Sequence, residues 1–133
     1  MIYAMAAMVL LTTLIGIYTV VGRIRSVSSG AVKIKTYRTM AAESMPERLL
    51  VAGRSFNNQF EVPLLFYVVG TLFVVLEAQS WLVLGLAWAF VASRYLQAII
   101  HLTYNNVLHR MLVFILGFIF VLALWIQLLL AVN

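Results

Sequence analysis

Four long apolar segments constrain this chain more than any other feature of its sequence. Each is close to the roughly 20 residues that a helix needs to cross the hydrocarbon core of a bilayer. Hydrophobic residues make up 65% of the 133-residue chain and charged residues 10%, so a soluble domain of this size could not bury its apolar surface. The pattern predicts an all-α, integral, multi-pass membrane protein with a bundle of four transmembrane helices.

The apolar segments predict a single membrane domain over residues 1–133, with helices at about 2–22, 46–76, 80–102 and 110–132. Because the first segment has no basic residues before it, we expect a retained anchor rather than a cleaved signal peptide. Ser28, Ser29 and Gly30 predict a break in the link that follows, and Pro46 marks the start of the second helix. The short link at 77–80 predicts a tight turn.

The basic residues are concentrated in one link. Six of the nine Lys and Arg residues lie within 23–48, and the net charge of the chain is +5. Such a bias orients a membrane protein and brings cations to anionic lipid headgroups, so we expect the bilayer and no nucleic acid as partner. The positive-inside rule places the links at 23–48 and 101–110 in the cytoplasm and both termini on the other side. The chain has no cysteine, which excludes a disulfide framework and a Cys-ligated metal.

A polar cluster interrupts the second apolar segment. It runs from Arg54 to Tyr67, RSFNNQFEVPLLFY, and holds one of the four acidic residues of the chain. Arg54, Asn58 and Glu61 are spaced i, i+4 and i+7, so they share one face of a helix. Counted back from the far end of this helix, Glu61 lies roughly 24 Å into the bilayer. An ionisable side chain at that depth marks a candidate functional site.

The third helix carries a matching polar stripe of Arg94, Gln97 and His101. Because Arg94 comes level with Glu61, at a depth of about 20–24 Å, we expect the two side chains to form an ion pair. Two interpretations of this pair stay open: a structural bridge that holds the helix register, or part of a binding site. For Asn58 and Gln97 the corresponding structural interpretation is an interhelical hydrogen bond.

Several arginines lie where the helices leave the membrane on the cytoplasmic side. Arg48, Arg54 and Arg110 either extend toward lipid phosphates or form an anion-binding mouth suited to a carboxylate-bearing ligand. Tyr104 is either an interfacial anchor or a hydrogen-bond donor to a thiolate. The two histidines of the chain have no carboxylate nearby in sequence, so we expect no metal site.

The order of these residues resembles the MAPEG family, the membrane-associated proteins in eicosanoid and glutathione metabolism. That family has an arginine in its second helix, an asparagine four residues later and a glutamate three residues after that, followed by a proline. The matching positions here are Arg54, Asn58, Glu61 and Pro63. Arginines in the family's third helix and near the start of its fourth match Arg94 and Arg110, whose spacing is similar to that of the prostaglandin synthases.

The resemblance implies a homotrimer of four-helix subunits in a bacterial inner membrane, with glutathione between subunits on the cytoplasmic side. The expected glutathione-binding residues are Arg54, Asn58, Glu61, Arg94, Gln97, His101 and Tyr104. Arg110 would be the catalytic residue, because a cation beside the thiol favours the thiolate that attacks an electrophile. The implied function is a glutathione-dependent membrane transferase or peroxidase that conjugates or reduces lipophilic electrophiles.

The sequence departs from the family's pattern at three places. The eicosanoid enzymes have a tyrosine seven residues beyond the third-helix arginine, where this chain has His101. The pair formed by Glu47 and Arg48 is displaced by about one helical turn relative to the family's pair. Pro63 also lies closer to Glu61 than the family's proline does. These differences are typical of a bacterial branch and leave the reaction itself open.

Two other functions stay open from the sequence. One is a non-catalytic membrane scaffold or a binder of a lipid or another small thiol. The other is a small multidrug-type transporter, which also has four helices of similar length. Transporters of that type need an acidic residue within the first helix, and residues 2–22 contain none, so this function is the less favoured.

Overall fold

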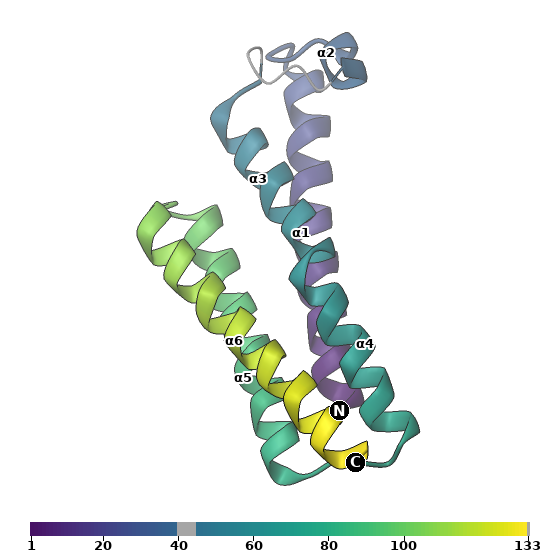
Figure 1. Cartoon of the computed structure of the whole chain (residues 1–133). Helices are drawn as coiled ribbons and strands as arrows, with labels where there is room; N and C mark the ends of the chain where they lie inside the picture. Colours follow the sequence, from purple (N-terminus) through teal and green to yellow (C-terminus); the bar gives the residue numbers. More distant parts are fainter. Residues whose placement is uncertain (40–44, 133) are drawn as a thin grey trace.

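The computed structural model describes residues 1–39 and 45–132, and every regular element within these ranges is helical. The elements are α1 (Ile2–Ser28), α2 (Ile34–Thr39), α3 (Glu47–Asn57), the 3-10 turn η2 (Asn58–Phe60), α4 (Val62–Val75), α5 (Trp81–Leu102) and α6 (Val107–Val132). Both chain ends lie at one end of the bundle and α2 lies at the other (Figure 1). Residues 40–44 of the predicted link at 23–48 lie outside the described residues.

The helix ends follow the local sequence. Gly16 and Gly22 are isolated glycines that a helix tolerates, so α1 continues past the predicted end at residue 22, and Arg25 in its last turn complements the helix dipole. Gly30 has a φ of +73°, a conformation that glycine adopts without strain, and its N–H donates to the Val27 carbonyl. The predicted break at Ser28–Gly30 is therefore confirmed. Pro46 is the N-cap of α3, as its position at a helix start predicted.

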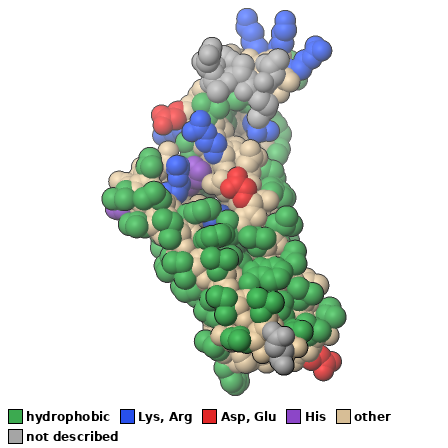
Figure 2. Space-filling view, viewed as in Figure 1, with side chains coloured by type: hydrophobic (Ala, Val, Ile, Leu, Met, Phe, Trp, Pro, Cys, Tyr) green, Lys and Arg blue, Asp and Glu red, His purple; other side chains and the backbone are tan. Residues whose placement is uncertain are grey.

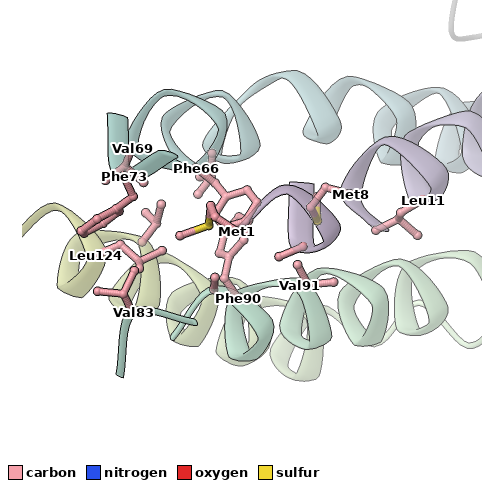
Figure 3. Close-up of a cluster of buried hydrophobic side chains, with 14 of the residues drawn as sticks. Met1, Met8, Leu11, Phe66, Val69, Phe73, Val83, Phe90, Val91 and Leu124 are labelled. Carbon is pink, nitrogen blue, oxygen red and sulfur yellow. The ribbon is translucent and has the colours of Figure 1, made fainter. Parts of the chain in front are cut away.

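The core is built from one apolar stripe on each spanning helix. In α1 the stripe follows the spacing i, i+4, i+7, i+11 expected for a helix that packs on one side. Phe66 of α4 stacks on Phe90 of α5 with ring centroids 4.5 Å apart, at the centre of the cluster in Figure 3. The α1 and α4 stripes comprise Ala4, Met8, Leu11 and Ile15, and Val62, Phe66, Val69 and Phe73. The buried face of each helix therefore fixes the orientation of that helix about its own axis.

The outward faces of the same helices are also apolar, which no soluble bundle of this size would tolerate. Four segments are long and apolar enough to cross a membrane: Ile2–Ser28, Glu47–Val75, Trp81–Leu102 and Val107–Val132. Figure 2 shows hydrophobic side chains over most of the visible face, with Lys, Arg and His gathered toward the end that carries α2. The predicted four-helix, multi-pass membrane protein is confirmed.

Hydrogen bonds between helices hold the two halves of the bundle together. The Tyr95 hydroxyl of α5 donates to the Ala7 carbonyl of α1 at 2.8 Å. The Thr19 hydroxyl of α1 contacts the Ala52 carbonyl of α3 at 3.3 Å. Toward the α2 end, the α5–α6 pair diverges from α1 and α3 (Figure 1).

Candidate functional site

The second membrane span is broken in the middle of its polar cluster. The predicted span at 46–76 is confirmed in its bounds, at Glu47–Val75, but its helix is not continuous. Helix α3 ends at Asn57 and α4 begins at Val62, with the turn η2 between them. Glu61 precedes α4 with φ −97° and ψ −101°, which is not helical. Pro63 explains the break, since it has no N–H to donate and its ring clashes with the carbonyl four residues earlier.

The break frees main-chain carbonyls, and a buried arginine contacts one of them. Arg94 of α5 is 1% exposed, and its Nη2 donates to the Asn58 carbonyl at 3.2 Å. Its guanidinium also lies over the ring of Phe114, 5.5 Å from the centroid. Charge-assisted hydrogen bonds of this kind are about twice as strong as neutral ones. Arg94 therefore caps the end of α3 from a neighbouring helix.

The ion pair predicted between Glu61 and Arg94 does not form: both residues are described, and no salt bridge joins them. The break leaves the Glu61 side chain exposed on the surface of the bundle, while Arg94 is turned toward the Asn58 carbonyl. The Glu61 carboxylate still acts electrostatically on the guanidinium at longer range. The structural role expected of a Glu–Arg bridge is taken over by the bond from Arg94 to the main chain.

The polar stripe of α5 is buried, as its spacing predicted, and it is incompletely paired. Gln97 and His101 are 4% and 3% exposed. Among the described residues, Arg94 Nε and Nη1, Gln97 Oε1, His101 Nε2 and Gln59 Oε1 are buried without a hydrogen-bond partner. An unpaired buried polar group costs about 1–3 kcal/mol. Ligand or solvent atoms that reached these groups would be held there favourably.

Two arginines from different helices act on the end of this stripe. The charges that act electrostatically on His101 are those of Arg110, near the start of α6, and Arg54 of α3. Arg54 is exposed and Arg110 is half-buried. The Nη1 of Arg110 donates to Asn105 Oδ1 at 2.8 Å, and Asn105 has a φ of +47° in the turn between α5 and α6. The fold thus lets Arg54 of α3 act on the same histidine as Arg110, which follows that histidine across the turn between α5 and α6.

A cavity of about 410 Å³ opens beside this group, between α1, α3 and the turn that joins α5 to α6. Its lining is mainly polar and comprises Tyr18, Glu47, Arg48, Val51, His101, Leu102, Thr103, Tyr104 and Asn105. Figure 2 shows cationic, acidic and His side chains close together on the visible face toward the end that carries α2. Of the predicted arginine mouth, only Arg48 lines the cavity, whereas Arg54 and Arg110 lie near His101.

Some predicted site residues have other partners, and some lining residues were missed. The Tyr104 hydroxyl lies 3.1 Å from His109 Nδ1, and the two rings meet edge to face. Tyr18 and Asn105 were not predicted. An interfacial tyrosine is common as an anchor, so nothing in the sequence distinguished Tyr18. Within the described ranges, no three His, Cys, Asp or Glu side chains are grouped so as to hold a metal ion.

One comparison with known proteins gives a match. No curated protein and no solved structure matches the chain. The profile of the MAPEG family matches residues 1–130, which is nearly the whole chain. That span includes the broken second helix with Arg54, Asn58 and Glu61, and also Arg94 and Arg110. This integral, multi-pass membrane protein therefore belongs to the MAPEG family, whose members are generally associated with glutathione and with transferase, peroxidase or related functions.

Proposed function

We propose that the protein is a glutathione-dependent membrane transferase or peroxidase that acts on lipophilic electrophiles. The observation that carries the proposal is the grouping of His101, Arg54 and Arg110 beside a polar cavity, with His101 Nε2 buried and unpaired. A tripeptide with two carboxylates and a thiol matches such a set, because arginines bind carboxylates and a cation stabilises a thiolate.

The residues divide into two roles. Arg54, Asn58, Glu61 and His101 would bind the peptide, and Tyr104 would lie at its rim. Arg94 and Gln97 are buried behind them, and Arg94 would hold the Asn58 turn in position. Arg110 would be the catalytic residue that stabilises the thiolate. Support for this division comes from the exposed positions of Arg54 and Glu61 and the buried position of Arg94.

The proposed conjugation needs no group beyond glutathione and the electrophile. The thiol proton leaves to water, and the sulfur forms a bond to the electrophilic carbon. The bond from that carbon to its leaving atom breaks, and its electron pair stays on the leaving atom. In the peroxidase reaction the thiolate sulfur attacks the terminal hydroperoxide oxygen and the O–O bond breaks, which gives an alcohol and a sulfenic acid on the sulfur. The thiol of a second glutathione then attacks that sulfur, and the disulfide forms as water leaves.

A homotrimer is part of the proposal, because the subunit alone leaves charges in an unfavourable place. Arg54 and Glu61 are exposed on the second membrane span. Charged side chains facing lipid cost several kcal/mol unless they are paired or covered. Neighbouring subunits and the bound peptide would cover them. We further propose a bacterial inner membrane with the site on the cytoplasmic side, supported by the basic residues at the α2 end.

Calorimetric titration of the protein with glutathione in lipid nanodiscs tests the binding, and thiolate absorbance tests its activation. We expect Arg54→Ala to weaken binding by about tenfold, or 1.4 kcal/mol. Arg110→Leu should keep most of the binding but lose the thiolate signal and the conjugation of an aryl halide, and Arg110→Lys should recover part of both. Arg38→Ala, which removes an exposed arginine on α2, is the matched control.

Three outcomes separate the possibilities. Binding with thiolate formation and turnover supports the enzyme. Binding without turnover in the wild-type protein would instead favour a non-catalytic binder of small thiols. If the wild-type protein gave neither binding heat nor thiolate absorbance with glutathione, the proposal would be overturned. Native mass spectrometry of the same sample tests the trimer, and a monomer with full glutathione affinity would contradict a site between subunits.

A further inference from the structure

The short helix α2 is folded back against the last turns of α1. The Ser26 hydroxyl of α1 donates to the Arg23 carbonyl and accepts from the Tyr37 hydroxyl of α2, which lies 2.7 Å away. The Arg23 guanidinium lies over the Tyr37 ring, 5.8 Å from its centroid. The N–H of Val32 donates to the Ser26 carbonyl at 3.0 Å, and the Val32 side chain is buried. These contacts make residues 23–38 a defined structure, termed the elbow below.

The elbow is strongly cationic. It holds five basic residues and no acidic one: Arg23, Arg25, Lys33, Lys35 and Arg38. All of them except Arg23 are exposed, and no salt bridge joins them to a residue that the structure describes. Figure 2 shows Lys and Arg side chains at the tip that carries α2. In the longer link at 23–48, six basic residues stand against two acidic ones, so the surrounding sequence does not neutralise this charge.

Apolar side chains are exposed among these cations. Ile24 and Ile34 are 59% and 76% exposed, and with Val27 and Tyr37 they line a notch of about 260 Å³ between α1 and α2. Exposed isoleucines are unfavourable in water. A surface that combines cations with exposed apolar side chains is favourable at the boundary between the headgroups and the acyl chains of a bilayer. The combination therefore fits a lipid surface better than a soluble acidic partner.

The length of α1 places the elbow at the depth of the headgroups. The helix has 27 residues and is about 40 Å long at 1.5 Å per residue. The hydrocarbon core of a bilayer is about 30 Å thick, and the headgroup layers bring the total to about 40–45 Å. Because Met1, just before α1, packs into the hydrophobic core of the bundle, the surplus of about 10 Å lies at the other end of the helix. The elbow therefore lies beside lipid phosphates.

We propose that the elbow is a docking surface for the phosphate headgroups of anionic phospholipids in the leaflet on the α2 side. Lys33, Lys35 and Arg38 bind the phosphates, while Ile24 and Ile34 enter the boundary with the acyl chains. Lysine and arginine suit this role, because their aliphatic stems rest on apolar surface while their charged ends reach a phosphate. The surface uses none of the residues assigned to glutathione, so the inference stands apart from the proposed enzyme.

The lipids that the full chain retains test this surface. Protein solubilised in mixed micelles of equal parts phosphatidylglycerol and phosphatidylcholine is purified, and its bound lipids are quantified by mass spectrometry. We expect the wild type to retain phosphatidylglycerol in preference, and the preference to fall as salt is added. Lys35→Gln and Arg38→Gln should each lower the preference about fivefold, which corresponds to about 1 kcal/mol per cation at a lipid surface. Lys35→Arg should keep it.

A further variant separates a built surface from charge alone. Tyr37→Ala keeps every charge but removes the ring beneath Arg23 and the hydroxyl that bonds to Ser26, so α2 is released from α1. Tyr37 lies outside the hydrophobic core, so the membrane bundle should stay folded, which size-exclusion chromatography checks. We expect Tyr37→Ala to lose part of the preference and Tyr37→Phe, which keeps the ring, to lose less. An unchanged preference in Tyr37→Ala would overturn the built surface and indicate a flexible basic stretch.

Competition experiments identify the source of the bound phosphate. Inorganic phosphate and polyglutamate should not displace phosphatidylglycerol from the wild-type protein at matched anion concentrations. Displacement by phosphate would overturn the inference in favour of a site for free anions, and displacement by polyglutamate would overturn it in favour of an acidic protein partner. Equal retention of the two lipids by the wild type would also overturn it. None of these outcomes depends on whether the protein binds glutathione.

Discussion

The guanidinium of Arg94 donates a hydrogen bond to the main-chain carbonyl of Asn58 across 3.2 Å, so a side chain of α5 holds the end of α3 where the second membrane span breaks. The bond joins a buried cation to a backbone group that a continuous helix would have paired internally. It links the geometry of the candidate site to the packing of two helices.

Removal of the Arg94 guanidinium should destabilise the subunit. We expect Arg94→Met to lower the free energy of unfolding by about 1.5–3 kcal/mol, because the Asn58 carbonyl loses a charge-assisted hydrogen bond in a buried place. Leu96→Met, at an exposed position of the same helix, is the matched control and should change little. Reversible unfolding in mixed micelles measures both. A variant Arg94→Met as stable as the wild type would show that the bond contributes nothing net.

Replacement of Pro63, the proline of the broken span, should change glutathione binding more than it changes the stability of the fold. In Pro63→Ala the N–H of residue 63 is restored and α3 can continue into α4, which realigns Arg54, Asn58 and Glu61. We expect protection of the amides around Glu61 from hydrogen exchange to rise and glutathione affinity to fall by about tenfold. Pro46→Ala changes the other proline, at the exposed N-cap of α3, and serves as the control. Unchanged glutathione affinity in Pro63→Ala would contradict a role for the break.

Close packing of α5 and α6 depends on a glycine. A Cβ at Gly117 would lie 2.6 Å from the hydroxyl oxygen of Ser93, which is itself buried and bonded to the Phe90 carbonyl. We expect Gly117→Ala to destabilise the subunit by about 1–3 kcal/mol, the usual cost of overpacking. Gly85→Ala, where a Cβ meets nothing within 4 Å, should be harmless.

A double variant identifies the cause of that loss. Ser93→Ala removes the clashing hydroxyl, so the pair Ser93→Ala with Gly117→Ala should be more stable than the sum of the single changes predicts, by about 0.5–3 kcal/mol. Thermal unfolding of the four proteins gives this coupling. Strict additivity would mean that the glycine is needed for another reason.

The turn residue Asn105 should position the proposed catalytic arginine. Asn105→Gly tolerates the φ of +47° but removes the oxygen that accepts a bond from Arg110. We expect glutathione binding to stay within about twofold, while thiolate formation and turnover fall. Asn105→Ala removes the same bond and adds backbone strain of about 1–2 kcal/mol, seen as lower thermal stability. Full turnover in Asn105→Gly would show that Arg110 needs no such support.

Much of the fold was predictable because its cause is local. The apolar segments are long enough to span a bilayer whatever they pack against, and Gly30 and Pro46 act on their own neighbourhood through φ and the missing N–H. The polar face of Arg94, Gln97 and His101 follows from helical spacing alone and is buried as one stripe. Family membership followed from the order of the same residues.

The broken span shows where local reasoning was insufficient. Pro63 was visible in the sequence, but the continuous apolar run around it favoured one helix. Placing Glu61 and Arg94 at equal depth predicted a contact, yet depth does not set the direction of a side chain. Once the backbone turns at Glu61, its carboxylate faces outward, and the nearest acceptor for Arg94 is the Asn58 carbonyl.

The sequence by itself determined that the chain has four segments able to cross a membrane, where α3 begins, and which face of α5 is polar. These properties depend on hydrophobicity, helical period and backbone restrictions within about one turn. Only the tertiary structure decided that Arg94 caps α3, that His101 lies under the influence of Arg54 and Arg110, and that Tyr18 lines the polar cavity. Those contacts depend on how helices far apart in sequence rotate and diverge, because each helix turns to bury its own apolar stripe.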